Sequence, residues 1–487
     1  MGTIRFISKT ITESAESIKW VATNGNIALN TTGEIIQQSK YKARYDEYKL
    51  IADNEAKDFN IAFSLNKIET TVVPLGILDF NNEYENPYFA FDYALSLNDI
   101  DALEFQIKDA DGNVIYQLTN LAPVVVTASK VPQIKNDIKN LLPAYPTKTP
   151  DFKTILEQFS LSPADYTKIG SYVIYWDGFD NDKVYDSIRF NNKKLSAKIT
   201  AIKAGKRKSL EVEFSTHYEQ VDWVDIKIDR KKNRIDTTLR VNLKDGGAEG
   251  LECWQNTRNF NSPHTKSEIC DWDKVSREAL TYYNKSPIRE RTQSYEDLEK
   301  LTLQGINQFW SRNLKNIGGG VKIISETYQV FVDAKVDKNG LSAPSIVYQT
   351  NSEESRSRNF ELSRKLFFTE GYLYRHDWNE YPNSILYSNL GWEYKAADAE
   401  DFKMTAAHEI GHEILLAYGG HIYSKTHKGS SHWSMILQDP SSSATNSPIY
   451  GEIDLMKYYK NYYDIPRTII AEIDLLKLLW LTKIKII

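Results

Sequence analysis

Short runs in which apolar and polar residues alternate fill the first half of the chain. Runs of this kind predict β-strands at residues 61–64, 72–80, 88–96, 103–107, 114–116, 172–176, 198–202, 209–214, 221–228 and 235–243. Turn sequences separate them, such as Asp-Ala-Asp-Gly-Asn at 109–113, which is typical of a hairpin. Short strands at regular spacing predict β-sandwich modules, and we expect the first module to be immunoglobulin-like.

The pattern changes to a helical period in the second half of the chain. Apolar residues recur every three or four positions within 295–313 and within 405–418, which predicts two amphipathic helices. Strands are predicted between these helices at 321–324, 328–336, 345–349 and 384–387. Residues 474–487 are apolar but interrupted by lysines, so we expect a buried terminal helix and strand rather than a membrane span.

These patterns predict a multidomain protein, with all-β modules followed by an α+β domain. The expected segments are a β-rich loading or docking domain at 1–122, a proline-containing linker at 123–150, a β-rich middle module at 151–250, a connector at 251–290 and an α+β domain at 291–487. Prolines at the density seen in 123–150 interrupt regular structure and stiffen a connection, which is the reason for placing a linker there.

Composition and charge narrow the possible functions. The 487 residues are 41% hydrophobic and 26% charged, and the net charge of -5 argues against a nucleic-acid binder. The N-terminus lacks the basic and apolar regions of a signal peptide, so we expect no use of the general secretory route. Cys253 and Cys270 lack the paired C-x-x-C spacing of a zinc site, and we expect two core cysteines, free or bridged.

The helix predicted at 405–418 carries the sequence His408-Glu409-x-x-His412. Residues four apart lie on one face of a helix, so the two imidazoles can bind one zinc ion from the same side. Glu409 would then lie beside the metal, where its carboxylate can accept a proton from a zinc-bound water. Gly419 and Gly420 predict the end of this helix, since glycine readily adopts the left-handed conformation.

A catalytic zinc usually has three protein ligands and one water, so a third ligand has to follow the motif. We expect His427, in a loop long enough to return to the metal, with Glu452 as the second choice. His421 is a weaker candidate, and Glu472 and Asp474 are more distant ones. Asp454 suits a position where it orients a ligand. The donor to the developing oxyanion is left open among Tyr423, His432, Tyr450 and Tyr458.

The stretches at 408–420, 423–432, 451–459 and 478–486 resemble the zincin-type metallopeptidase toxin domain of bacterial polymorphic toxins. Upstream stretches between 172 and 247 are similar to the shared middle module of such toxins, and the N-terminal β-region to loading domains of type VI or contractile injection systems. The resemblance implies a secreted effector with a zinc cofactor, a protein or peptide substrate, a partner in the injection apparatus and an immunity protein. It carries over His408, Glu409 and His412, and it does not decide between His427 and Glu452.

Three functions compete on this basis. The first is a zinc endopeptidase that is delivered without a signal peptide by a contractile apparatus into a target cell. The second uses the same chemistry on peptidoglycan, as a cell-wall peptidase or amidase. The third is a non-enzymatic structural or adhesive component of the apparatus, in which the motif is incidental.

Overall fold

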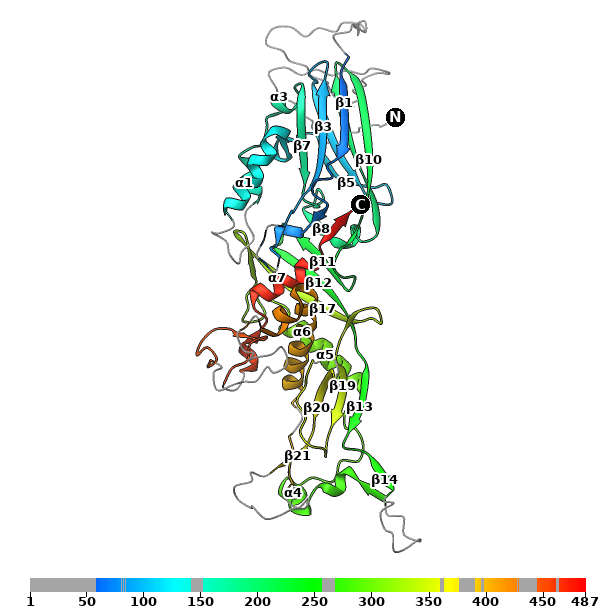
Figure 1. Cartoon of the computed structure of the whole chain (residues 1–487), viewed down its shortest axis with the longest axis vertical. Helices are drawn as coiled ribbons and strands as arrows, with labels where there is room; N and C mark the ends of the chain where they lie inside the picture. The colour runs from blue at the N-terminus through cyan, green and yellow to red at the C-terminus, as the bar shows by residue number, and fades with distance from the viewer. Residues whose placement is uncertain are drawn as a thin grey trace, which may run out of the picture.

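The computed structural model describes most of the chain from residue 58 onward. The described residues are 58–79, 81, 83, 85–141, 152–255, 268–359, 363–375, 390–395, 398–426, 428, 445–460 and 464–487. They form a long, mostly β-sheet molecule with a few helices (Figure 1). A β-sandwich lies at one end, and helices α5 (Tyr295–Phe309) and α6 (Ala399–Thr426) lie near the middle.

Two sheets pack face to face in the sandwich. One has the order β1 (Asn60–Leu65), β3 (Phe89–Ser96), β7 (Gly170–Trp176) and β6 (Val125–Thr127). The other has the order β2 (Thr71–Val72), β25 (Ile484–Ile486), β10 (Lys206–Tyr218), β9 (Lys193–Lys203), β4 (Ala102–Lys108) and β5 (Val114–Leu118). Aromatic rings fill the space between them: Phe91 lies 5.4 Å from Phe105 and 5.7 Å from Phe214, centroid to centroid.

The region between the two predicted β-modules packs on this sandwich. Helices α1 (Val131–Leu141) and α2 (Phe152–Glu157) place Ile134 and Ile155 against Val173, on the outer face of the first sheet. The short helix α3 (Pro163–Tyr166) leads into β7. Strands from the predicted first and middle modules share both sheets, so residues 123–150 do not separate two independent sheets.

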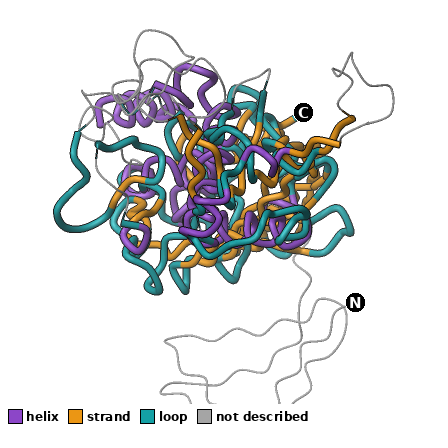
Figure 2. The backbone as a smooth tube through the Cα atoms, turned by 90° about the horizontal axis from the view of Figure 1, so that it is seen from below, coloured by secondary structure: helices purple, strands orange, loops and turns teal. Residues whose placement is uncertain are grey.

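A third sheet joins the predicted middle module to the predicted α+β domain. Its order is β16 (Val321–Ile323), β17 (Glu326–Val336), β12 (Arg234–Asn242), β11 (Val224–Asp229) and β8 (Val184–Asp186), and β18 (Leu341–Ser342) also pairs with β12. β12 and β17 are parallel over eight residue pairs, from Arg234 with Gln329 to Val241 with Val336. Figure 2 shows the described residues along the long axis, with strands and helices projected over one another.

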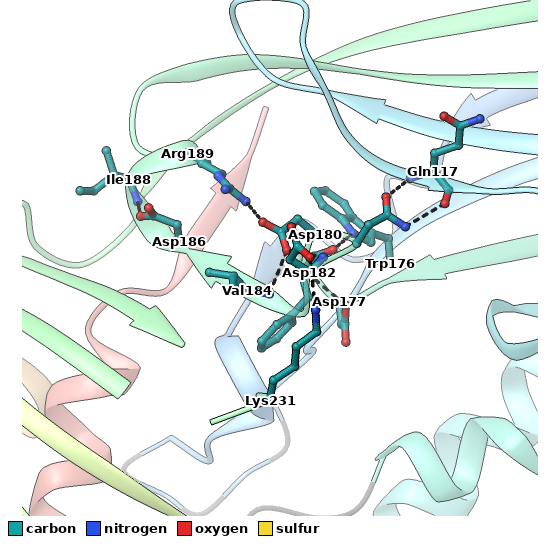
Figure 3. Close-up of polar contacts among 12 residues, drawn as sticks. Gln117, Trp176, Asp177, Asp180, Asp182, Val184, Asp186, Ile188, Arg189 and Lys231 are labelled. Carbon is teal, nitrogen blue, oxygen red and sulfur yellow. Dashed lines mark hydrogen bonds and ion pairs between the residues drawn. The ribbon is translucent and has the colours of Figure 1, made fainter. Parts of the chain in front are cut away.

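The loop between β7 and β8 connects the sandwich to this third sheet and is fixed by ion pairs (Figure 3). Asp180 accepts hydrogen bonds from the backbone amides of Asp182 (3.0 Å) and Val184 (2.9 Å), and from the Arg189 guanidinium (2.8 Å). Lys231 pairs with Asp182 at 3.2 Å. Each of these carboxylates thus has a cationic partner, and the loop is a structural joint.

The C-terminal segment returns to the sandwich. Helix α7 (Glu472–Trp480) and strand β25 confirm the predicted terminal helix and strand. β25 pairs on one side with β10, at Thr216 and Ile486, and on the other side with β2, at Thr71 and Lys485. The predicted sandwich of local strands is therefore corrected: one strand of its second sheet comes from the far end of the sequence.

The remaining elements lie around and below the central helices. They are the parallel sheet of β13 (Asp245–Glu249), β19 (Ser345–Gln349) and β20 (Lys365–Thr369), the strand pairs β14 (Cys253–Gln255) with β15 (Glu268–Cys270), β21 (Tyr372–Arg375) with β22 (Leu390–Glu393) and β23 (Ile453–Asp454) with β24 (Thr468–Ile469), and helix α4 (Arg277–Tyr282). No helix within the described ranges is both long and apolar enough to cross a membrane.

Two predictions of local structure need correction. Cys253 and Cys270 form a disulfide between β14 and β15, which is the bridged alternative; Cys270 is buried as predicted, but Cys253 is exposed. The strand predicted at 72–80 stops at Val72, because Pro74 begins a 3-10 turn in which Leu75 has a φ of 61°. The strand predicted at 384–387 lies outside the described residues.

Candidate metal centre

Helix α6 carries the predicted zinc motif and is longer than expected. It begins at Ala399, where Asp398 caps it by accepting a hydrogen bond from the backbone amide of Glu400 (2.9 Å). Gly420 has a φ of 73° and kinks the helix there, but helical residues continue to Thr426. The predicted glycine stop is therefore a kink, and the turn after it brings Ser424 back to His412.

The rest of the domain packs closely on the motif. A Cβ atom at Gly411 would lie 2.5 Å from the Met456 sulfur and 3.0 Å from the Trp310 ring, so two side chains require this glycine. Trp310 also donates its indole N–H to the carbonyl of Ala407 (3.1 Å). Gly305 of α5 allows a close approach to the backbone of Lys403. These contacts fix the helix on both sides of the motif.

Backbone carbonyls hold both imidazoles of the motif in one tautomer. Nδ1 of His408 lies 2.7 Å from the carbonyl of Leu455, and Nδ1 of His412 lies 3.0 Å from that of Ser424. A carbonyl oxygen only accepts hydrogen bonds, so each Nδ1 must carry the proton. In the neutral form of each ring Nε2 then keeps its lone pair, which is the arrangement of histidine ligands to a metal.

The two lone pairs face one another. Nε2 of His408 lies 3.2 Å from Nε2 of His412, and both side chains are buried. Two nitrogens bound to one tetrahedral zinc at about 2.0–2.1 Å are about 3.3 Å apart. The pair thus has the spacing that a shared zinc ion requires.

Burial also keeps His408 neutral. Loss of solvent lowers the pKa of this imidazole to about 4; the Leu455 carbonyl opposes the shift and the Arg356 guanidinium adds to it. A neutral imidazole is the form that binds metals, and His408 holds this form at neutral pH.

Two residues, Asn359 and Arg364, are bonded to the same part of α6. Asn359 donates its side-chain amide to the backbone carbonyl of Glu409 (3.0 Å), and Arg364 donates to Asn359 (3.1 Å) and forms an ion pair with Glu413. Further along the chain, the ring of Phe368 in β20 meets that of Phe402 in α6 edge-on, at 5.3 Å. β20 therefore runs antiparallel along α6, and the motif lies between the two points of contact.

Glu452, the second choice for the third ligand, lies in a different place. Its carboxylate accepts two hydrogen bonds from Arg312, at 2.7 and 2.8 Å, and the guanidinium of Arg312 is almost fully buried. Arg312 also donates to the carbonyls of Gly318, Gly320 and Ile470. Both oxygens of Glu452 thus face a fixed guanidinium.

This ion pair positions the carbonyl that holds His408. Glu452 precedes β23, which pairs with β24, and the amide of Leu455 donates to Ile469 (2.9 Å). The carbonyl of Leu455 then receives the Nδ1–H of His408. Glu452 and Arg312 therefore act on the site through the backbone of 453–455.

His427 itself lies outside the described residues, but Lys428, which follows it, is described. Lys428 forms ion pairs with Asp454 and, at 2.8 Å, with Asp474, which is fully buried. Burial alone lowers the pKa of Lys428, but Asp474 and Asp454 outweigh this effect and raise it. The more distant candidate ligands are thus in ion pairs, Asp474 with Lys428 and Glu472 with Arg312 at 3.9 Å.

The candidate oxyanion donors that the structure describes lie at different distances from the motif. The Tyr458 hydroxyl lies 2.9 Å from Nε2 of His408, on the side where a metal would bind. Tyr450 is 87% exposed, and the ring of Tyr423 packs against Tyr418 at 5.2 Å. His432 lies outside the described residues. Of these candidates, Tyr458 is the one in direct contact with the motif.

Several residues that shape the site had no signal in the sequence. Leu455 and Ser424 act through backbone carbonyls, which any residue type supplies. Arg312 lies within the helical pattern predicted at 295–313, and only its burial marks its role.

Among the described residues, no group of three or more His, Cys, Asp or Glu side chains could hold a metal ion. The centre thus consists of a histidine pair that fits two of the ligands to a zinc ion. Comparisons with protein-family models and with curated protein sequences found no match to this chain, so its function has to be inferred from the site itself.

Proposed function

We propose that this chain is a zinc-dependent peptidase with its catalytic centre on α6. One observation carries the proposal: two buried imidazoles bring their Nε2 atoms to 3.2 Å from one another, and backbone carbonyls hold both Nδ1 atoms. Glu409, the next residue in the motif, is also buried, and in an H-E-x-x-H motif its carboxylate would lie beside the metal.

A zinc ion held by His408 and His412 would lower the pKa of a bound water to about 7 and would polarise a substrate carbonyl. Glu409 accepts the proton of the attacking water and returns it to the leaving amine. Asn359, bound to the carbonyl of Glu409, and Arg364, bound to Glu413, fix this part of the helix. The Tyr458 hydroxyl donates a hydrogen bond to the developing oxyanion.

The outer edge of β20 is partly paired by the chain itself. Lys365 exchanges two backbone hydrogen bonds with Arg358 on the side away from β19, so the odd-numbered residues of β20 direct their N–H and C=O groups to this outer edge. The carbonyl of Phe367 and the amide of Thr369 share it. The Phe367 amide donates to the Ser357 hydroxyl (3.0 Å), so a peptide could pair with this edge only beyond these contacts.

His427 completes the zinc site in this proposal. Lys428, the residue after His427, forms an ion pair with Asp454. Asp454 precedes Leu455, whose carbonyl holds His408. Glu452, bound to Arg312, then positions the site without contacting the metal.

The biological setting follows the sequence resemblance: an immunoglobulin-like loading domain, a zincin-like catalytic domain and delivery of the effector into a target cell by a contractile or type VI-like apparatus. A protein substrate is proposed first on the sequence resemblance, with peptidoglycan as the alternative. A structural component with an incidental motif is disfavoured, because such a protein would not need to bury both histidines of the motif.

Metal analysis tests the site directly. We expect about one zinc per chain in the wild type, loss of zinc in His427→Ala, and retention in Glu452→Ala. Retention in His427→Ala with loss in Glu452→Ala would assign the third ligand to Glu452. A wild-type chain that holds no zinc, even after zinc is supplied, would refute the proposal.

Activity is tested with labelled casein and, in parallel, with purified peptidoglycan. We expect cleavage of casein, a loss of about 1,000-fold in Glu409→Gln with unchanged zinc content, and no change in the control Glu400→Gln. Glu400 is a glutamate on the same helix that pairs with Lys403. Release of peptidoglycan fragments without casein cleavage would assign the chemistry to the cell wall instead.

A further inference from the structure

An arginine covers the tyrosine that contacts the motif. The guanidinium carbon of Arg356 lies over the Tyr458 ring, 5.0 Å from its centroid, and the Tyr458 hydroxyl lies 2.9 Å from Nε2 of His408. The rings of Tyr458 and His408 meet edge-on, with 5.0 Å between their centroids. Arg356 is exposed to solvent, so its charge is accessible beside the candidate metal centre.

Hydrogen bonds hold the segment that carries Arg356 against α6 and β20. Asn359, three residues later, donates its side-chain amide to the carbonyl of Glu409 (3.0 Å). Arg358 exchanges two backbone hydrogen bonds with Lys365 of β20, at 2.9 and 3.0 Å. Both contacts lie within three residues of Arg356, and the segment therefore keeps this arginine beside the motif.

The charge of Arg356 acts on the motif. Burial is the main reason for the lowered pKa of His408, and the Arg356 guanidinium adds to it, because a nearby cation disfavours a second positive charge. The same repulsion would act on a zinc ion held by His408 and His412, so Arg356 opposes the binding of the metal. A cation at this position is favourable when an anion binds beside it.

The charges around the motif also favour an anion. Arg364, the other arginine bound to this part of α6, pairs with Glu413, and this pair is neutral as a whole. With zinc bound, the centre would carry more positive than negative charge even after Glu409 is counted, and Arg356 adds to the excess. A substrate with a carboxylate near the scissile bond would therefore be attracted more strongly than a neutral one.

Guanidinium groups bind carboxylates through two parallel hydrogen bonds. We propose that Arg356 is a specificity-determining residue that binds a carboxylate of the peptide substrate, either an acidic side chain close to the scissile bond or the C-terminal carboxylate. This inference rests on the proposed function of the same centre. The Tyr458 ring holds the guanidinium beside the hydroxyl that we assign to the developing oxyanion, so the bound carboxylate lies near the reacting carbonyl.

Peptide binding tests this inference because it needs no turnover. The full-length chain carrying Glu409→Gln is supplied with zinc and titrated with fluorescein-labelled peptides in an alanine–glycine background. In the first series, nonapeptides with amidated C-termini carry glutamate, or its neutral counterpart glutamine, at each position in turn. In the second series, peptides of three to nine residues contain alanine and glycine only and end in a free carboxylate or an amide.

One of the two series should show about 10-fold tighter binding of the carboxylate peptide than of its neutral counterpart, and this series identifies the source of the carboxylate. Arg356→Gln should reduce the preference to less than about 3-fold. Arg356→Lys keeps the charge but not the two parallel hydrogen bonds, and an intermediate preference is expected. Arg358→Gln is the matched control, since it removes another exposed arginine of the same segment and should leave the preference unchanged.

Zinc affinity separates recognition of the substrate from a purely structural role. In the absence of peptide, Arg356→Gln should bind zinc about 2-fold more tightly than the parent chain, because a repelling charge that solvent and salt partly screen is removed. Competition with a chelating dye measures this affinity. Weaker zinc binding in Arg356→Gln would show that Arg356 maintains the structure of the centre, and would overturn its role in recognition.

The combined outcomes distinguish the two proposals. A carboxylate preference that survives in Arg356→Gln, or equal binding of the carboxylate peptides and their neutral counterparts, overturns the role of Arg356. Zinc binding and casein cleavage without a carboxylate preference overturn that role alone. A preference that depends on Arg356, in a chain that neither binds zinc nor cleaves, supports the role of Arg356 and refutes the peptidase.

Discussion

The sandwich and the half of the molecule that holds α6 are stabilised in different ways. Among the described residues up to 250, no Asp, Glu, His, Lys or Arg side chain is buried. After residue 250 the buried side chains of these types are Asp271, Arg312, His408, Glu409, His412, Glu413, Asp474 and Lys477. The sandwich interior consists instead of stacked and edge-on aromatic rings, such as Phe89 with Phe190 at 5.4 Å.

The contrast between aromatic packing and buried charges separates two tasks: stabilising the fold and fixing the position of particular atoms. Aromatic burial contributes free energy without fixing any single hydrogen-bonding atom. A buried charge costs desolvation energy and gains it back only in one geometry, so it fixes its partners in place. The half of the molecule with the motif uses such groups to position backbone carbonyls against the two imidazoles.

The largest expected effect is that of Arg312→Ala. It leaves the Glu452 carboxylate and three backbone carbonyls without their donor, and we expect a loss of about 3–5 kcal/mol in the free energy of unfolding, together with reduced zinc content. Urea unfolding and elemental analysis measure the two effects. Arg230→Ala is the control, because Arg230 pairs with Asp177 at a partly exposed position. Equal losses in the two variants would contradict the contrast between the halves.

Tyr458→Phe should act on catalysis and spare the fold. Loss of the hydroxyl near Nε2 of His408 is expected to reduce kcat/KM by about 10- to 100-fold, equivalent to about 1.4–2.7 kcal/mol. Casein cleavage and urea unfolding are measured on the same preparation. Tyr450→Phe is the control, since Tyr450 is exposed. Unchanged kcat/KM in Tyr458→Phe would exclude the hydroxyl as the oxyanion donor.

Phe91→Leu in the sandwich should lower stability without changing the site on α6. The ring of Phe91 contacts those of Phe105 and Phe214, so a smaller apolar side chain should cost about 1–2 kcal/mol in unfolding free energy. Zinc content and kcat/KM should remain those of the wild type. A loss of zinc in this variant would show that the two halves are not separable in the way described.

The smallest effect concerns Lys477, a buried lysine that lies over the ring of Tyr418. Burial lowers the pKa of this ammonium to about 8. Its charge therefore destabilises the fold below pH 8, and the cost disappears as the pH rises from about 8 towards 10.5. Lys477→Met should raise the free energy of unfolding at pH 7 by about 1 kcal/mol.

This gain should shrink at pH 10, where the wild-type lysine is already neutral in the folded state. Urea unfolding at the two pH values measures both differences. The exposed Lys460→Met is the control, with no change expected at either pH. A gain that is equal at pH 7 and pH 10 would exclude the charge as its cause.

The sequence predicted the elements far better than their partners. The spacing of apolar residues alone located α5, α6 and most strands, because each such pattern lies within one short stretch of sequence. The pairing of β12 with β17 and the place of β25 depend on residues far apart in the chain, and an alternating pattern does not name its partner.

The candidate site divides in the same way. His408, Glu409 and His412 could be read from their spacing, because one helix carries all three. Glu452 could not be told from a ligand, since the guanidinium that binds it comes from Arg312, 140 residues earlier. Tyr458 was one of four equivalent candidates until the fold placed it at the imidazole.

The position of β25 has a consequence for the order in which the protein can be made. β2 joins the second sheet through β25, and β10 has β25 as its neighbour on that side. During translation β10 emerges some 270 residues before β25. The nascent chain therefore exposes an unpaired strand edge while the helix with the zinc motif is being synthesised, and such edges invite pairing with other chains. Most of the half that holds α6 is therefore synthesised before the sandwich receives the strand β25.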